Sequence, residues 1–214
     1  FNKAFSVCQG VLVSWLNADD TLLQGEITEV AQTLLKKPST NWIAGNILWM
    51  TEDKKIILAR KGENWNSQLA KYGILNVYGP TTFFTLDLFN KVGKLHKWMH
   101  YRMDTELWWR FVEAGACYER LENYTWAFRV HKGSKTTGSY FDDSELSDTN
   151  HPSQIQMKKE DEHISKNHIH KSIFGRLLIN IIRLTTPRYL LSMIDSFKNK
   201  GKKYTMVLKG SAYR

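Results

Sequence analysis

Apolar and polar residues alternate along the first 150 residues with two periods, one typical of strands and one typical of helices. Runs of apolar and β-branched residues predict buried strands at 11–16, 42–50, 55–60, 117–121 and 125–130. The second and third of these runs are separated by a short polar turn, which predicts a hairpin. Apolar residues at helical spacing predict one helix that ends at Pro38 and another, through Leu107, that ends at Gly115. Helices that alternate with strands favour an α/β fold with a mostly parallel sheet and flanking helices.

The pattern changes near residue 132. Residues 132–156 are rich in Gly, Ser, Thr, Asp and His and have almost no apolar periodicity, which predicts a loop or a disordered segment. Apolar residues return at helical spacing in 173–184, flanked by arginines, and predict an amphipathic helix. This run is too short to cross a bilayer, which takes about 20 apolar residues.

Three segments follow from these patterns. We expect a folded portion at 1–138, a polar linker at 139–171, and a basic, helical C-terminal tail at 172–214. The opening is unusual for an α/β domain, since residues 1–10 resemble the end of a helix that leads into a strand already in mid-sheet. We therefore expect the chain to be a fragment that lacks its first βα units.

Charge is distributed unevenly along the chain. The formal net charge is +9, and all of this excess lies in 151–214, because 1–150 carries equal numbers of acidic and basic side chains. The basic residues are not interleaved with aromatic platforms, so the sequence argues against a nucleic-acid partner. Two cysteines are too few for a disulfide framework, which makes a reducing compartment the default.

Two carboxylates, Asp19 and Asp20, follow the predicted strand at 11–16. Open α/β sheets bind ligands at the carboxyl ends of their strands. Adjacent carboxylates repel each other there, and a divalent ion with hard oxygen ligands, Mg²⁺ or Mn²⁺, offsets that repulsion. The alternative is that Asp20 caps a helix that begins near Leu22.

The segment around these carboxylates carries a resemblance. Residues 10–20, GVLVSWLNADD, resemble the G-x-x-x-x-W-L-N-x-D-D segment of family 2 glycosyltransferases, which have the GT-A (Rossmann-like) fold and use nucleotide-diphosphate sugars. The resemblance implies that residues 17–19 stand at the DXD position of the family. Asp19 would then contact the metal that bridges the donor diphosphate, and Asn17 would be a neutral contact to the ribose or the metal.

A second segment is similar to the acceptor-side loop and helix of the same family. Residues 79–84, GPTTFF, followed by Leu88-Phe89 and Val92-Gly93, resemble Q-P-x-x-F-F…L-F-x-x-V-G. The resemblance implies acceptor contacts at Thr81 and Thr82. Gly79 departs from the usual Gln, so a polar contact is not expected there.

Residues 101–110, YRMDTELWWR, match the Y-x-M-D-x-E-L-W-x-R form of the family's E-D motif. In that motif the Asp is the general base, which implies this role for Asp104. Displacement at an anomeric carbon needs a group that takes the acceptor's hydroxyl proton, and apolar neighbours such as Met103 would raise the pKa of a carboxyl toward neutrality. The alternative is a helix N-cap. We also expect Trp108 to contact the acceptor.

The third segment, residues 129–136, RVHKGSKT, is similar to R-x-H-x-x-S-x-T at the end of the family's catalytic core. A histidine there can ligate a metal, and basic residues can neutralise a leaving diphosphate. We therefore expect His131 as a metal ligand, with a surface histidine as the alternative, and Arg129 and Lys135 at the donor. The other histidines show no metal-like spacing and are expected to be solvated: His96, His100, His151, His163, His168 and His170.

The resemblance covers residues 1 to about 138 and implies inverting, metal-dependent transfer of a sugar to a saccharide or lipid-linked acceptor, typical of bacterial cell-surface polysaccharide or glycolipid synthesis. It implies a cytoplasmic protein, peripheral on the inner face of the cell membrane, and a fragment with little activity by itself. The alternative is a non-catalytic membrane-surface protein that acts through its tail. In that case residues 173–191 lie as an amphipathic helix on anionic lipid, whereas the other possibility is that this helix packs its apolar side on the core.

Overall fold

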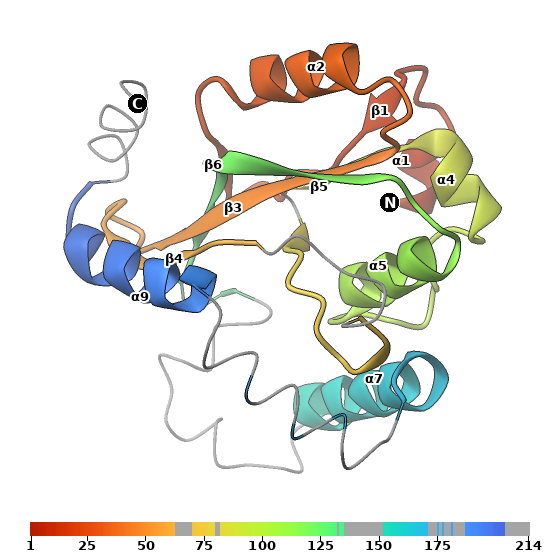
Figure 1. Cartoon of the computed structure of the whole chain (residues 1–214). Coiled ribbons are helices and arrows are strands. Elements are labelled where there is room, and N and C mark those ends of the chain that lie inside the picture. The colour runs from red at the N-terminus through yellow and green to blue at the C-terminus, as the bar shows by residue number, and fades with distance from the viewer. Residues whose placement is uncertain are drawn as a thin grey trace.

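The computed structural model describes residues 1–62, 70–79, 82–131, 133–134, 152–170, 175, 177, 181 and 187–203. These residues form a mixed α/β fold, a curled sheet with helices on both of its faces (Figure 1). The elements are α1 (Asn2–Phe5), β1 (Leu12–Val13), β2 (Thr21–Leu22), α2 (Glu26–Lys36), β3 (Trp42–Met50), β4 (Ile56–Arg60), β5 (Thr82–Thr85), α4 (Leu86–Lys91), α5 (Met103–Glu113), β6 (Tyr118–Arg129), α7 (Pro152–His168) and α9 (Pro187–Asn199).

The strands pair in the order β1-β5-β3-β6-β2, and β4 also pairs with β3. One edge of β3 is shared, because its residues 42–44 pair with β5 and its residues 47–50 pair with β4, both antiparallel. Its other edge runs parallel to β6. The β1–β5 and β2–β6 pairs are antiparallel. The expectation of a mostly parallel sheet is therefore wrong: among the described strands, only β3 and β6 run parallel.

The β3–β4 hairpin is confirmed, whereas the two strands expected at 117–121 and 125–130 form the single strand β6. The polar residues between them do not break β6, because the ladder with β3 shifts its register here rather than ending. Gly45 lies at this shift, where an added Cβ would come within 2.2 Å of the Thr125 hydroxyl oxygen. Glycine therefore permits the close approach of the two strands.

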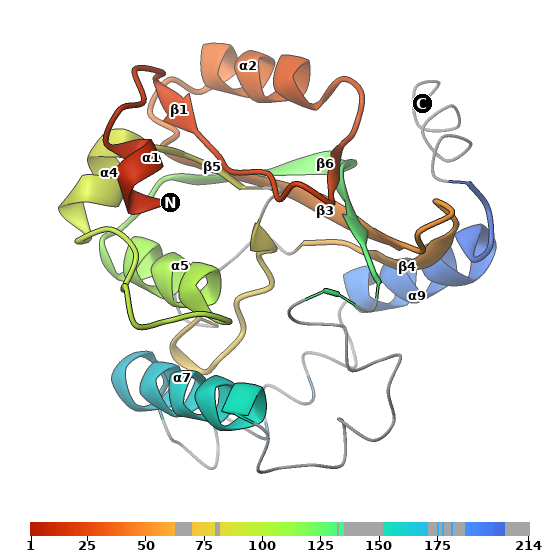
Figure 2. The ribbon, with the colours of Figure 1, turned by 180° about the vertical axis from the view of Figure 1, so that it is seen from behind.

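Helices cover both faces of the sheet (Figures 1 and 2). On one face, Val30 of α2 packs with Ile43 and Leu121. On the other, α4 and α5 enclose the larger core, an aromatic cluster that includes Trp42, Phe84, Phe89, Trp108 and Phe111. This second face is the one that positions the candidate site.

Helix α7 lies within the segment expected to be a polar linker, and it forms a third layer beneath α5 (Figure 1). Its Ile164 packs with Ala70, Met99 and Trp109. The expectation of a loop is therefore wrong for 152–156. It failed because α7 has few apolar residues, and its attachment depends largely on buried polar groups, above all Glu160, which is 0% exposed.

Helix α9 packs along β4 with its polar side. The Ser196 hydroxyl accepts the amide hydrogen of Ala59 at 3.0 Å, and that of Ser192 accepts the amide hydrogen of Lys61 at 3.0 Å. These serines satisfy backbone groups at a free sheet edge. Most of the apolar run at 173–184 lies outside the described residues. Among the helices that are described, none has both the length and the apolarity to span a bilayer.

Candidate functional site

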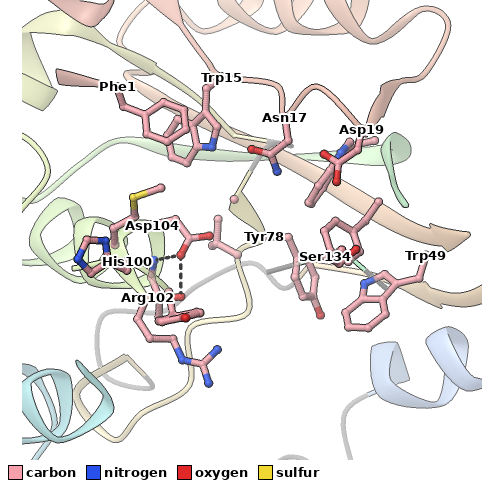
Figure 3. A pocket seen from close by; sticks show the side chains of 18 residues that line it. Phe1, Trp15, Asn17, Asp19, Trp49, Tyr78, His100, Arg102, Asp104 and Ser134 are labelled. Carbon is pink, nitrogen blue, oxygen red and sulfur yellow. Dashed lines mark hydrogen bonds between the residues drawn. The ribbon is translucent and has the colours of Figure 1, made fainter. Parts of the chain in front are cut away.

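A cavity of about 600 Å³ lies between the β1–β2 loop, the ends of β3 and β6, and the start of α5. Asn17 and Asp19 lie on one wall, and Asp104 lies on the opposite wall (Figure 3). Much of the remaining lining is aromatic: Phe1, Trp15, Trp49, Tyr78, Tyr101, Trp126 and Phe128. The cavity thus brings together acidic residues from two segments that the sequence analysis singled out separately.

The β1–β2 loop is held in shape by Asp20. Its carboxylate accepts hydrogen bonds from the Asn17 side chain at 2.9 Å and from the Arg129 backbone amide at 3.0 Å. Burial raises the pKa of Asp20 to about 6, although these hydrogen bonds oppose the shift. Asp20 is therefore a positioning residue that does not line the cavity, which corrects its expected role as a metal ligand. It is followed by strand β2 and caps no helix, so the alternative interpretation is also wrong.

Asp19, by contrast, faces the cavity, and its side chain is 39% exposed. The Nε2 atom of His131 lies 2.9 Å from one of its carboxylate oxygens. His131 follows the end of β6, and its backbone amide donates to the Ser134 hydroxyl at 3.1 Å. A carboxylate of the cavity wall is therefore held beside an imidazole that lies just outside the lining.

Arg129 has a different role from the expected donor contact. Its guanidinium donates to the backbone carbonyl of Asp19 at 2.8 Å and to that of Glu52 at 3.0 Å, and Arg129 does not line the cavity. It fastens the β1–β2 loop to the end of β6. Lys135, the other cation expected at the donor, lies outside the described residues.

Asp104 is the second residue of α5. The helix begins after Arg102, so Asp104 is not its N-cap, which rules out the alternative interpretation. One carboxylate oxygen accepts the Thr105 amide hydrogen at 2.7 Å. Burial raises the pKa of Asp104 above its usual range, and the hydrogen bonds from Thr105 only partly oppose this. A carboxyl group with a raised pKa at a cavity wall is suited to accept a proton near neutral pH.

Gly79 faces Asp104 across a very short distance. A Cβ atom built on Gly79 would lie 2.4 Å from the second carboxylate oxygen of Asp104. The carboxylate therefore occupies the space that any larger side chain at position 79 would need. The departure from Gln at this position thus has a physical consequence, which the sequence pattern alone did not reveal.

Two expected acceptor contacts are wrong. Thr82 is 0% exposed, and its hydroxyl donates to the Tyr78 carbonyl at 2.8 Å. Trp108 is also 0% exposed and stacks between Trp15 and Trp42, with ring centroids 5.7 Å apart in each pair. Both side chains support the wall from behind. Thr81 lies outside the described residues.

Six other residues that line the cavity were not expected at the site: Trp49, Tyr78, His100, Tyr101, Phe128 and Ser134. β3 is buried except at Trp49, and Phe128 is one of several partly buried residues of β6, so no alternation of burial marks either residue. Tyr78 and His100 belong to irregular segments, for which the sequence carries no periodic signal. They reach the cavity only through the tertiary fold.

Histidines expected to be solvated gather around Glu106, which is 1% exposed. His96 Nε2 lies 3.3 Å and His168 Nε2 lies 3.5 Å from the same oxygen of Glu106. The ligand atoms of His96, Glu106 and His163 lie within 4.8 Å of one another. His96 comes from the loop before α5 and the other two histidines from α7, so no local spacing could have predicted this cluster.

No family model matches the chain, and a search of curated proteins finds no match to it. Functional inference therefore depends on the geometry of the cavity and on the motifs quoted above.

Proposed function

We propose that this chain carries the catalytic cavity of a GT-A-type inverting glycosyltransferase, which moves a sugar from a nucleotide-diphosphate donor to an acceptor hydroxyl. The observation that carries the proposal is the position of Asp104, with its raised pKa, across one cavity from Asn17 and the Asp19–His131 pair. The order of the three matching sequence segments supports the same reaction. A mixed α/β fold is compatible with it but does not single it out.

The donor would lie against the wall formed by Asn17 and Asp19, with His131 beside Asp19. The Asp19 carboxylate and the His131 imidazole suit a Mg²⁺ or Mn²⁺ ion whose other ligands are phosphate oxygens and water, because these ions bind few protein groups when they accompany a diphosphate. When bound, such an ion would neutralise charge on the leaving diphosphate. Asn17 is available for a neutral contact to the ribose. Asp20 and Arg129 act from behind by holding this loop in place.

Asp104 would act as the general base. As the acceptor oxygen forms its bond to the anomeric carbon, the bond from that carbon to the diphosphate oxygen breaks, and the hydroxyl proton passes to Asp104. A single displacement of this kind inverts the configuration at the anomeric carbon. The hydrogen bond from the Thr105 amide orients the carboxylate and leaves its second oxygen, the one beside Gly79, for the acceptor.

The aromatic lining is suited to a saccharide acceptor. Trp49, Tyr78 and Tyr101 line the same cavity as Asp19 and Asp104. Aromatic faces pack on the C–H groups of pyranose rings, and they combine an apolar surface with polar edges. We propose a free or lipid-linked saccharide as the acceptor, in the synthesis of a bacterial surface polysaccharide or glycolipid at the inner face of the cell membrane.

The test is transfer from a panel of nucleotide-diphosphate sugars, measured in the full-length gene product with Mn²⁺ or Mg²⁺. Asp104→Asn is expected to lower kcat by at least about 100-fold, within the usual range for loss of a general base, while donor affinity stays nearly unchanged. Asp19→Asn is expected to weaken donor binding. Asp53→Asn, at an exposed turn, is the matched control and should behave as wild type. An Asp104→Asn variant with full activity would refute the assignment.

A second function, attachment to an anionic membrane surface, is favoured by one side of α9. Its polar side faces β4, whereas large apolar side chains on it stay 44–88% exposed: Leu190, Leu191, Met193, Ile194 and Phe197. Lysines follow at 198, 200, 202 and 203. Exposed apolar side chains beside a basic segment have the composition of an interfacial helix on anionic lipid.

Vesicle flotation tests this attachment. The chain is expected to float with phosphatidylglycerol vesicles and not with phosphatidylcholine vesicles, and added salt should weaken the binding. Leu190→Ser/Phe197→Ser should remain in solution. Leu35→Ser, which changes an 81% exposed leucine on α2, should float as wild type does. Equal flotation of the Leu190→Ser/Phe197→Ser variant would refute a lipid-binding role for α9.

A further inference from the structure

We propose that His96, Glu106 and His163 form a binding site for a divalent transition-metal ion of the zinc class, with His168 as a fourth nitrogen donor beside it. An ion bound here would hold α7 against α5. The site is separate from the Asp19–His131 pair. It does not depend on the proposed glycosyltransferase activity.

The separations between donor atoms match such an ion. Tetrahedral zinc has ligand bonds of about 2.0–2.1 Å to nitrogen and oxygen, which places neighbouring ligand atoms about 3.3–3.4 Å apart. His96 Nε2 is 3.3 Å from the Glu106 carboxylate, and His168 Nε2 is 3.5 Å from the same oxygen. The ligand atoms of His96, Glu106 and His163 all lie within 4.8 Å of one another. Imidazole nitrogen and carboxylate oxygen are also the donors that zinc accepts.

The carboxylate of Glu106 is held in a fixed position. Arg110 donates a hydrogen bond to each of its two oxygens, from Nε at 2.8 Å and from a terminal nitrogen at 2.6 Å. A ligand that is fixed before the ion binds loses little entropy on binding.

His168 is a buried histidine beside Glu106. Its side chain is only 7% exposed, and among the described residues its Nε2 atom has no hydrogen-bond partner. Its Nδ1 atom lies 2.7 Å from Glu113. A carboxylate on one ring nitrogen, with the other nitrogen aimed at the ion, is the usual arrangement of histidines at metal sites. A buried ring nitrogen that lies 3.5 Å from a carboxylate oxygen and makes no hydrogen bond to it is suited to a ligand in that space.

His163 of α7 lies close to His96, with ring centroids 6.0 Å apart. Its Nδ1 atom lies 3.0 Å from the side-chain nitrogen of Asn167. Flipping the Asn167 amide exchanges the positions of its oxygen and nitrogen. The oxygen can then accept the Nδ1 proton of His163, which leaves Nε2 to bind an ion. A metal here would thus tie two helices and one loop together.

Metal titration of the full chain tests the proposal, with Asp19→Asn as the background so that the cavity does not contribute. Calorimetry with Zn²⁺ is expected to give one ion per chain, and Co²⁺ is expected to give the intense visible absorption of a tetrahedral complex. His163→Ala should weaken binding at least tenfold. His170→Ala, which removes an exposed histidine just past α7, should bind as the background does.

Glu113→Gln gives a further readout, because it changes a group that supports a ligand without removing the ligand. Such changes weaken metal binding by about 10–100-fold. Circular dichroism verifies that each variant is folded, and His163→Gln replaces His163→Ala if the alanine variant is not. The absence of Zn²⁺ binding by the folded background chain, or equal binding by His163→Ala, would overturn the proposal and leave a network of ion pairs. Neither result would bear on the activity of Asp104 or Asp19.

Discussion

The carboxylate of Glu160 on α7 accepts the backbone amide hydrogen of Arg102, the residue before α5, at 2.7 Å. The same carboxylate accepts the amide hydrogens of Tyr101 at 2.9 Å and His100 at 2.7 Å. The turn that precedes Asp104 is therefore shaped by a helix from a later part of the chain. This contact makes α7 a structural part of the candidate site.

Replacing Glu160 with Gln should destabilise the fold and disturb the site. An amide has one acceptor oxygen where the carboxylate has two, and a hydrogen bond to a charged group contributes about 1.5–3 kcal/mol. We expect urea unfolding to show a loss of at least about 2 kcal/mol at pH 7. Asp161→Asn, at the exposed neighbour that pairs with the Arg102 side chain, should lose less than about 1 kcal/mol.

The loss of stability in Glu160→Gln should depend on pH. Burial raises the pKa of Glu160, but its hydrogen bonds with His100, Gln156, Arg102 and Tyr101 outweigh that effect and lower it below 4.5. A lowered pKa stabilises the folded state above pH 4.5, and this contribution is lost as pH falls further. The difference in the free energy of unfolding between wild type and Glu160→Gln should therefore become smaller below pH 4.5. A gap that is constant from pH 7 to pH 3 would contradict this account.

Replacing Gly79 with Ala should displace the Asp104 carboxylate. The new Cβ would lie 2.4 Å from a carboxylate oxygen, which is the movable end of a side chain, so the side chain should rotate and the backbone should hold. We expect a melting temperature close to that of wild type and a sugar-transfer rate at least about tenfold lower, since the proposed base leaves its position. Gly93→Ala offers a contrast: its φ of 87° strains any other residue, but nothing lies within 4 Å. Gly93→Ala should lower the melting temperature and leave the sugar-transfer rate unchanged.

Replacing Glu26 with Gln should stabilise the protein at alkaline pH. Glu26 is 2% exposed, and neither carboxyl oxygen has a hydrogen bond within the described part of the chain. Burial raises its pKa from 4.5 to about 9. The unfolded chain loses this proton near pH 4.5 while the folded chain keeps it, so stability falls between these pH values by up to about 1.4 kcal/mol per unit.

Thermal melts from pH 5 to pH 8.5 test this expectation. Wild type should lose stability across the range, and Glu26→Gln should lose less. Glu52→Gln, at an exposed turn, is the control and should retain the wild-type slope. Parallel slopes for wild type and Glu26→Gln would show that Glu26 does not titrate as its burial predicts.

Replacing Ser192 and Ser196 with Ala should loosen α9 from β4. The backbone amides of Ala59 and Lys61 would lose their acceptors, at a cost of about 1 kcal/mol for each hydrogen bond. Hydrogen exchange at these two amides should accelerate while the amides of β3 stay protected. Phe197→Ser, which changes an 88% exposed side chain, should leave the exchange of both amides unchanged.

Sequence patterns identified part of the candidate site because its residues stand beside regular elements. Asp19 follows a strand and Asp104 opens a helix, and both line the cavity as expected. The errors share a cause. Thr82 and Trp108 belong to the right segments, but which side of a segment faces a cavity depends on its neighbours in space. Asp20 was misassigned because its carboxylate bonds to Asn17 and to the Arg129 amide and does not line the cavity.

The sequence by itself determined the local elements of this protein: the hairpin of β3 and β4, the helices α2 and α5, and the acidic residues at their ends. These follow from the period of the apolar residues, which is a local property. Only the tertiary structure decided that the sheet is mixed, that α7 belongs to the fold, and that Glu160 and the histidines act at α5. These contacts join polar groups from distant parts of the chain, and such pairing leaves no periodic trace in the sequence.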